Sequence, residues 1–260
     1  MIARRRDDEI DRIDRACRVV RTILDELAEM ARVGTTTAEL DRHAEARCED
    51  FGARPAFKGY MGYPAALCVS VNEQVVHGIP GPRRLESGDL VSIDFGVLLD
   101  GYYGDSAITC LVGEASEADR ELSRVTRECL MRAVEQVRPG RRIGDIGRAV
   151  EEHATAHGYG VVREFVGHGI GTRMHEEPQI PNYRTNRTTP RIEAGNVLAI
   201  EPMITAGRPE VRVLADGWTA VTRDGSKAAH WELVVAATPE GPRVLGDPVA
   251  AGCGEERNRA

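Results

Sequence analysis

Acidic side chains stand inside apolar segments of this sequence that are typical of buried β-strands. Asp94 is flanked by Ile93 and Phe95, and Glu201 and Glu232 have similarly apolar neighbours. Burying an unpaired carboxylate costs several kcal/mol or more, a large part of the net stability of a domain. Each of these carboxylates therefore needs a group that neutralises it.

A fourth acidic residue joins this set through the geometry of a hairpin. Asp100 and Gly101 form a dipeptide that favours a two-residue turn between strands. Such a turn pairs Gly96 with Asp105, which puts Asp94 and Asp105 on the same face as diagonal neighbours. A loop of odd length would put them on opposite faces, and the pairing would fail.

One histidine is placed to complete a metal site. His168 stands among glycines in the segment 166–171, where backbone freedom lets an imidazole reach a cleft. Four carboxylates and one imidazole suit two divalent ions with carboxylates bridging them. The candidate ligands are Asp94, Asp105, His168, Glu201 and Glu232. Taken singly, each aspartate or glutamate could instead cap a turn or pair with an arginine, so the prediction rests on the joint pattern.

The composition is that of an ordinary globular protein. The chain has 260 residues and a net charge of −7, with no apolar run long enough for a membrane span or a signal peptide. We therefore expect a cytoplasmic protein that binds neither DNA nor membranes, because nucleic-acid binding needs a basic surface. The six cysteines contain no CxxC pair, which favours reduced thiols over disulfides or a zinc finger.

The elements that must position these residues follow from periodicity. Helices are predicted over 7–33, from Thr36 with Glu39 in a capping box, over about 116–138, and from about 143 to 158. Strands are predicted near 66–77, 88–112, 161–167, 196–205 and 229–237. His43, His153 and His157 fall on helices at positions typical of solvated side chains, and we assign them no role.

The chain also contains a faint internal repeat. Segment 86–94 resembles segment 193–201, and a turn, a helix and a His-Gly-Ile triplet precede each of them. Two similar halves, each a helix followed by strands, predict an α+β domain with pseudo-twofold symmetry. In such a fold we expect the active site where the halves meet.

Motifs in a fixed order reveal a family resemblance. They are Val-Asn-Glu at 71–73, His-Gly-Ile-Pro at 77–80, Ile-Asp-Phe-Gly at 93–96, Gly-Asp at 104–105, Gly-His-Gly-Ile-Gly at 167–171, His-Glu-Glu-Pro at 175–178 and Ile-Glu-Pro-Met at 200–203. Together they resemble type I methionine aminopeptidase over about residues 5–245. The resemblance implies a pita-bread fold with a curved antiparallel sheet and helices outside. We expect one catalytic domain over 1–247, with pseudo-halves of about 5–138 and 139–247, and a polar tail over 248–260.

The resemblance also implies roles for individual residues. Asp94 matches a ligand of one ion, His168 with Glu201 mainly the other, and Asp105 and Glu232 the bridging ligands. In the implied mechanism, water made acidic by the ions attacks the first peptide carbonyl. Glu201 takes up its proton, His175 stabilises the oxyanion, and His77 contacts the peptide beside the scissile bond. The substrates would be nascent proteins with a small second residue, and cobalt, manganese, iron or zinc would fit these ligands.

A pocket for methionine follows from the same resemblance. Aromatic faces make favourable contacts with a thioether. The matching positions are Phe57, Tyr60, Tyr63, Cys68, Met174 and Trp218. Phe57 and Cys68 are equally compatible with an ordinary core position.

The sequence departs from the family pattern at four positions, His230, Leu233, Ala199 and Met61. We expect these departures to alter metal affinity or rate and to leave the reaction unchanged. The resemblance further implies a monomer without the long insertion of type II enzymes, working in possible transient proximity to the ribosome.

Two other functions are compatible with the same fold. An Xaa-Pro hydrolase of the aminopeptidase P or prolidase type usually carries a further N-terminal domain, and this sequence starts at the catalytic portion. A non-catalytic binding module would have no need of all the matched ligands and of both His77 and His175, so their joint presence disfavours it.

Overall fold

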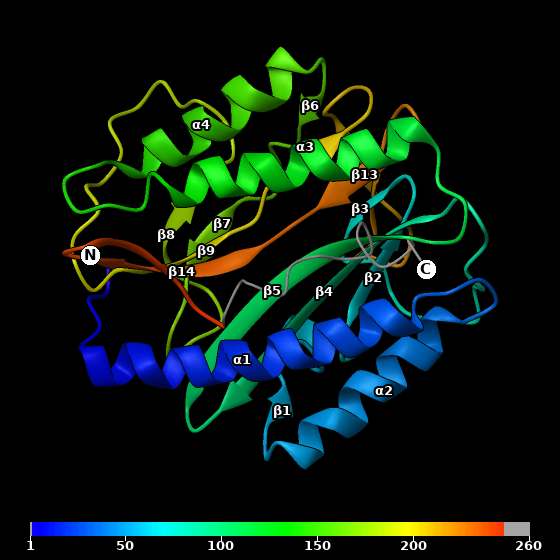
Figure 1. Ribbon diagram of the computed structural model, residues 1–260, viewed down its shortest axis with the longest axis horizontal. Coiled ribbons are helices and arrows are strands. Elements are labelled where there is room, and N and C mark those ends of the chain that lie inside the picture. Colours follow the sequence, from blue (N-terminus) through cyan, green and yellow to red (C-terminus); the bar gives the residue numbers. More distant parts are fainter. Residues whose placement is uncertain (1, 247–260) are drawn as a thin grey trace, which may run out of the picture.

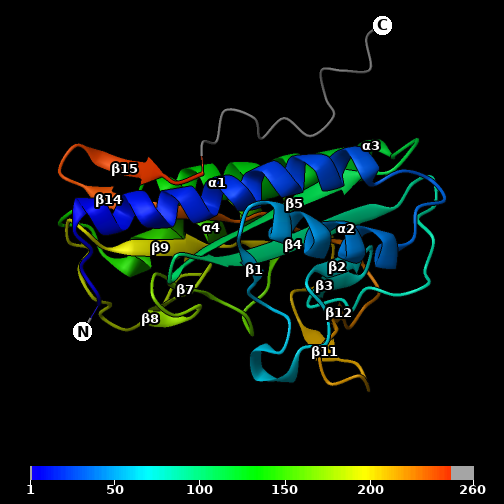
Figure 2. The same ribbon diagram turned by 90° about the horizontal axis from the view of Figure 1, so that it is seen from below.

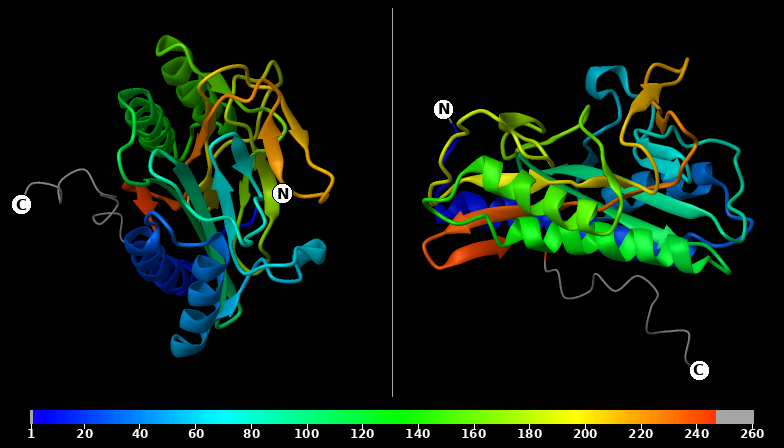
Figure 3. Two further views of the ribbon diagram at one scale, coloured as in Figure 1. Left: turned by 90° about the vertical axis from the view of Figure 1, so that its right-hand side faces the viewer. Right: turned by 90° about the horizontal axis from the view of Figure 1, so that it is seen from above.

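The computed structural model describes residues 2–246, in which the helices cover one face of a set of antiparallel strands (Figures 1 and 2). The helices are α1 (Asp7–Met30), α2 (Thr37–Asp50), the short 3₁₀ helix η1 (Tyr60–Gly62), α3 (Glu117–Val134) and α4 (Ile143–Ala156). Segments around η1 and strand β11 (Val211–Val213) rise from the opposite face (Figure 3). The predicted polar tail lies outside the described residues.

The strands fall into small sheets that meet along the middle of the molecule. In the N-terminal half they are β1 (Arg54–Pro55), β2 (Cys68–Val71), β3 (Gln74–Val76), β4 (Leu90–Leu99) and β5 (Tyr102–Leu111). In the C-terminal half they are β6 (Gly160–Val161), β7 (Gly167–Gly169), β8 (Glu176–Ile180), β9 (Val197–Ile200), β10 (Met203–Thr205), β11, β12 (Ala220–Thr222), β13 (Ala228–His230), β14 (Leu233–Thr238) and β15 (Gly241–Val244). The longest sheet path runs β15-β14-β9-β7-β8, and β4 pairs with β1, β2 and β5.

Helix α1 lies directly on β5. Its apolar stripe, which includes Ile13, Val20 and Leu24, is completely buried, as the spacing predicted. At Gly104 a Cβ atom would stand 2.6 Å from the backbone nitrogen of Cys17, so only glycine permits this approach. The helix thus fixes the outer face of the strand that carries Asp105.

The hairpin β4–β5 has the predicted register. Gly96 pairs with Asp105, and Leu99 pairs with Tyr102 across the turn at 100–101. Both turn residues have positive φ, 50° at Asp100 and 82° at Gly101, as a tight turn that continues the strand twist requires. The hairpin therefore presents Asp94 and Asp105 on one face, as expected.

Four predicted strands are interrupted in the structure. The run 66–77 divides into β2 and β3 at Asn72 and Glu73, and the run 161–167 is strand only at its two ends, in β6 and β7. The run 196–205 divides into β9 and β10 at Glu201 and Pro202, because proline has no N–H with which to continue a ladder. The run 229–237 divides into β13 and β14 at Trp231 and Glu232. The expectation that these glutamates lie inside continuous strands is therefore wrong, and both stand at strand junctions. Two predicted helices are also too long: α1 ends at Met30, and α3 ends at Val134, beyond which residues 135–138 form turns.

The internal repeat is visible in matching backbone contacts. An isolated bridge joins Thr36 to Arg84 in the first half, and an equivalent bridge joins Arg142 to Arg191 in the second. The two halves meet where Ala107 of β5 forms a bridge with Glu232. The contact between the two halves therefore includes a candidate ligand, Glu232.

Two exclusions from composition can be compared with the described residues. The cysteines among residues 2–246 are buried and form no disulfide, while Cys253 lies outside that range. No helix in the same range has the length and apolar character needed to cross a bilayer.

Candidate metal centre

The five predicted ligands converge from both halves of the molecule. The long hairpin β4–β5 supplies Asp94 and Asp105, and β7 supplies His168. Glu201 follows β9, and Glu232 precedes β14. Because Leu233 pairs with Ile200 in adjacent antiparallel strands, the register brings the two glutamates to the same end of the sheet.

His168 presents a nitrogen lone pair to this centre. Its Nδ1 lies 2.9 Å from the carbonyl oxygen of Gly169, which only accepts hydrogen bonds, so Nδ1 carries the proton. Its Nε2 lies 3.6 Å from Glu201 Oε1 and 3.9 Å from Asp105 Oδ2. Burial lowers the pKa of His168 to about 3, so the ring is neutral at neutral pH. A neutral imidazole held in this way is suited to bind a metal ion.

The carboxylates lack the partners that buried charges need. Ligand atoms of Asp105, His168 and Glu232 all lie within 4.8 Å of one another. One oxygen each of Asp94, Asp105 and Glu232 is buried without a hydrogen-bond partner. These unpartnered carboxylate oxygens and the lone pair of His168 Nε2 together suit a divalent cation. Such a cation would supply the positive charge that the buried carboxylates lack.

Burial and mutual repulsion raise the pKa values of these carboxyl groups. Burial raises the pKa of Asp94 to about 7. For Asp105, burial and then the charges of Glu232 and Asp94 raise the pKa well above its usual value. Burial first, and neighbouring carboxylates second, also raise the pKa values of Glu201 and Glu232. The metal-free centre therefore favours protons, and a bound cation would favour the ionised ligands.

Two further histidines flank the centre. The ring of His175 lies 4.2 Å from that of His168, centroid to centroid, and its Nδ1 is 2.8 Å from the hydroxyl of Tyr60. His77 has a left-handed φ of 60° and its ring packs edge-on against Phe165 and Trp218. Burial lowers the pKa of His77 to about 4 and also lowers that of His175, so both rings are neutral at neutral pH.

The predicted pocket residues form an apolar cluster beside the ligands. Tyr63, Ala65 and Cys68 are buried together, with Phe57, Ile79 and Trp218 packed against them. Cys68 pairs directly with Asp94 across β2 and β4, which joins pocket and centre. Phe57 and Met174 both approach Gly96, where an added Cβ would stand 2.8 Å and 3.2 Å from their side-chain carbons. Tyr60 lies apart from this cluster and stacks on His175.

Known proteins resemble this chain in sequence and in fold. The model of metallopeptidase family M24 matches residues 11–239. The chain is 46% identical to a methionine aminopeptidase of Clostridium perfringens over 245 residues, 94% of this chain and 98% of the relative. It superposes on a methionine aminopeptidase structure from Thermotoga maritima with a TM-score of 0.93 and 42% identity, covering 95% of this chain and 100% of that one.

The chain belongs to metallopeptidase family M24. The resemblance to methionine aminopeptidases that the motifs indicated is therefore confirmed, and so is the pita-bread fold. A prolidase from Pyrococcus furiosus has a TM-score of 0.77 and 26% identity, and the match covers 94% of this chain but only 65% of the prolidase. Membership of the family supports metal-assisted peptide hydrolysis as the reaction of this chain.

Three of the four departures from the family pattern, His230, Leu233 and Ala199, lie in strands next to the candidate ligands. His230 is buried, its Nε2 lacks a hydrogen-bond partner, and burial lowers its pKa to about 3. Leu233 and Ala199 are buried in paired strands, whereas Met61 is 82% exposed at a left-handed φ of 49°. Their effect on metal affinity or rate stays a prediction.

Several supporting residues of the metallopeptidase escaped the sequence analysis. Partly buried Arg5 holds Glu176, which also accepts hydrogen bonds from the backbone of Thr172 and Arg173 and so braces the loop that carries His175. The side chain of Ser106 donates a 2.6 Å hydrogen bond to the backbone oxygen of Glu232. These contacts join segments far apart in the sequence, and neither residue type signals them.

Proposed function

We propose that this metallopeptidase removes the initiator methionine from new proteins with two divalent ions held by Asp94, Asp105, His168, Glu201 and Glu232. The observation that carries the proposal is the group of unpartnered carboxylate oxygens around the free Nε2 of His168, next to an apolar pocket. The names of its relatives in Clostridium perfringens and Thermotoga maritima support methionine as the residue removed.

The ligand residues hold the metal ions, and each half contributes to them. Asp94 and Asp105 from the N-terminal half, and His168, Glu201 and Glu232 from the C-terminal half, would hold the ions. When bound, the ions lower the pKa of water and polarise the peptide carbonyl. Ions of manganese, iron, cobalt or zinc all accept this mixture of carboxylate and imidazole ligands.

The other polar residues move protons and orient the substrate. Glu201 accepts the proton of the attacking water, a role that suits a carboxyl group whose pKa is raised by burial. The Tyr60 hydroxyl lies 2.8 Å from Nδ1 of His175, and with this hydroxyl as the donor the proton of the neutral ring is on Nε2. That N–H can then donate to the oxyanion as it develops. His77, on the side of Phe165 and Trp218, contacts the peptide next to the scissile bond.

The pocket selects the side chain that is removed. Its aromatic members, Phe57, Tyr63 and Trp218, surround a thioether favourably, and Cys68 and Met174 complete the lining. The Tyr63 hydroxyl lies 2.9 Å from the backbone oxygen of Leu67 and 3.0 Å from that of Gly78, so its polar tip has partners within the protein. Substrates with a small second residue are favoured.

The setting that we infer is the cytoplasm, where the chain works as a monomer on nascent N-termini. Proximity to the ribosome would fit such a substrate. A pull-down with purified ribosomes and a measurement of mass in solution would test these points.

The decisive experiment compares two tripeptides, Met-Ala-Ser and Ala-Pro-Ala, by mass spectrometry with metal-loaded protein. We expect release of methionine from the first peptide only, and complete loss of this release with a chelator. Cleavage of only the proline peptide would move the assignment to the Xaa-Pro hydrolases. Bound metal without any cleavage would favour a binding module.

A further inference from the structure

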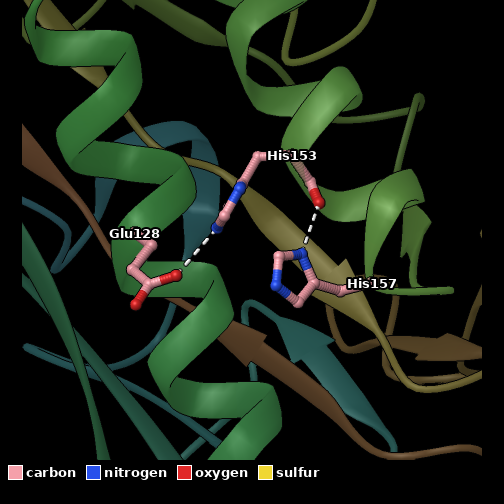
Figure 4. A group of neighbouring side chains, drawn as sticks. All are labelled: Glu128, His153 and His157. Atoms are coloured by element: carbon pink, nitrogen blue, oxygen red, sulfur yellow. Dashed lines mark hydrogen bonds and ion pairs between the residues drawn. The ribbon is translucent and has the colours of Figure 1, made fainter.

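A second group of potential metal ligands lies between α3 and α4, on the outer layer of the molecule (Figures 1 and 4). Glu128 comes from α3, and His153 and His157 come from successive turns at the end of α4. One ligand atom of each lies within 4.8 Å of the others. Apart from the catalytic ligands, this is the one such group among residues 2–246.

The hydrogen bonds of this cluster leave coordinating atoms available. His157 Nδ1 lies 2.9 Å from the backbone oxygen of His153, so Nδ1 carries the proton and Nε2 presents its lone pair (Figure 4). His153 Nε2 faces Glu128 Oε2 at 2.8 Å. Arg124 pairs with the other oxygen, Oε1, and so anchors the carboxylate without covering Oε2. The side chain of His153 is only 9% exposed, which corrects the expectation that it is a solvated helix position.

The equivalent place in the N-terminal half is filled differently. Arg47 of α2 stands as far from its N-cap, Thr36, as His153 stands from Arg142. The C-caps Phe51 and His157 also correspond. There, Arg47 binds Glu26 of α1 and lies over the Phe51 ring, so a permanent cation neutralises the glutamate. In the C-terminal half two imidazoles replace guanidinium and phenyl ring, and the fixed positive charge of α2 has no counterpart on α4.

We propose that Glu128, His153 and His157 form a peripheral metal site that takes a borderline transition-metal dication such as Zn²⁺, Ni²⁺ or Cu²⁺. Two imidazoles on one helix face and a carboxylate are ligands that these ions prefer. Tetrahedral zinc with bonds of about 2.0–2.1 Å needs ligand atoms ~3.3 Å apart, and the ligand atoms here lie within 4.8 Å of one another before any ion is bound. For His153 to bind the ion through Nε2, the proton on that nitrogen must first move to Nδ1 or to solvent. Water completes the coordination sphere.

The position of this cluster in the fold favours a bound cation, and a cation bound there would link two helices. The cluster lies at the C-terminal end of α4, where backbone carbonyls carry partial negative charge. A metal ion there joins α3 to α4, as Arg47 joins α2 to α1 through Glu26. Because it binds the folded state only, it should raise the temperature of unfolding.

Zinc content of matched variants tests the proposal. The full chain is stripped with a chelator, dialysed against excess Zn²⁺ and analysed for zinc by elemental mass spectrometry. We expect the wild type to hold one zinc ion per chain more than His157→Gln. His43→Gln is the matched control, because His43 also hydrogen-bonds a glutamate of the neighbouring helix, Glu26, at 2.7 Å but has no second histidine beside it. This control should bind as much zinc as the wild type.

A second variant guards against a folding defect. His157→Phe copies the residue that the N-terminal half uses and should lose the same zinc ion while it keeps the ring packing. Peptide hydrolysis at saturating metal should be equal in all variants, which would show that the catalytic centre is loaded normally. Equal zinc content in the wild type and both His157 variants would overturn the proposal.

Discussion

The two halves of this metallopeptidase share a backbone plan and place different chemistry on it. The N-terminal half delivers Asp94 and Asp105 from one continuous hairpin, whereas the C-terminal half delivers His168, Glu201 and Glu232 from interrupted strands. On the outer helices, a fixed ion pair in the first half corresponds to an imidazole cluster in the second. The repeat therefore conserves where side chains emerge, while the identity of each side chain decides the charge at that place.

The largest effect should follow from replacing a ligand of the continuous hairpin. In Asp105→Asn we expect methionine release to fall roughly a thousandfold, since a metal ion contributes several kcal/mol of transition-state stabilisation. Steady-state kinetics with bound metal measured in parallel would check this.

A matched control comes from the repeat itself. Asp89 holds the backbone N–H of Glu86 at 2.9 Å, and Asn196 does the same for Glu193 at 2.7 Å. Asp89→Asn copies the C-terminal half and should keep activity within a few-fold. If activity fell equally in both variants, replacing any buried aspartate would have the same effect on activity. That result would contradict the assignment of Asp105 to the metal centre.

The second prediction concerns the stability of the metal-free protein against pH. The pKa of Asp94 is raised from 3.8 to about 7, and those of its carboxyl neighbours are also raised. The folded state therefore binds more protons than the unfolded state, so this contribution is full below about pH 4 and is lost as pH rises towards 7. For Asp94 the loss is up to roughly 4 kcal/mol.

Bound metal should reverse this trend, because a cation favours the ionised ligands. Thermal unfolding with Mn²⁺ and with a chelator at several values between pH 5 and 8 would measure it. We expect the rise in melting temperature on metal addition to grow with pH, and less steeply in Asp94→Asn. A metal effect independent of pH would contradict raised pKa values at the centre.

The sequence was sufficient for the parts of this centre that rest on local geometry. The turn at Asp100 fixes the register of β4 and β5, so the approach of Asp94 to Asp105 could be derived from residue spacing. The convergence of His168 and Glu232 on them could not, because it depends on how two halves pack. The internal repeat, which placed the site where the halves meet, and the family resemblance were the features that pointed to it.

Long-range braces were beyond prediction for a related reason. Nothing in the residue types links Arg5 to Glu176 or Tyr60 to His175, which lie far apart along the chain. The strand interruptions at Glu201 and Glu232 also escaped periodicity, since an apolar run reads the same whether or not it bends.

A smaller effect should follow when the contact between the halves at Tyr60 is weakened. Tyr60→Phe removes the hydroxyl 2.8 Å from His175 Nδ1 and with it the group that fixes the ring tautomer. A neutral hydrogen bond contributes about 0.5–1.5 kcal/mol, so we expect kcat to fall about two- to tenfold with little change in KM.

Tyr63→Phe provides the contrast, because its hydroxyl bonds to Cys68 and to backbone oxygens, all in its own half. That variant should lower the melting temperature and leave kcat nearly unchanged. If Tyr60→Phe changed KM alone, Tyr60 would act as a pocket residue and have no part in positioning His175.

The smallest effect on stability should come from a substitution that gives helix α4 of the C-terminal half the arginine that α2 has in the N-terminal half. In His153→Arg, a guanidinium would replace the imidazole that now bonds Glu128, as Arg47 bonds Glu26. Hydrogen bonds from Arg47 are the main cause of the lowered pKa of Glu26. For Glu128, burial raises the pKa, but hydrogen bonds from His153 and Arg124 lower it by more. The pKa of Glu128 is therefore also lowered.

Because both glutamates are already ionised and paired, the exchange should change the free energy of unfolding by less than ~1 kcal/mol in a chelator, as is usual for exposed ion pairs. Zinc should then stabilise the wild type more than His153→Arg, because the variant lacks one of the metal ligands. The variant has a guanidinium beside Glu128 in place of that ligand. Methionine release should be the same in both. If zinc raised the melting temperature equally, the two helix pairs would be equivalent in function as well as in position, and the contrast between the halves would be confined to the catalytic centre.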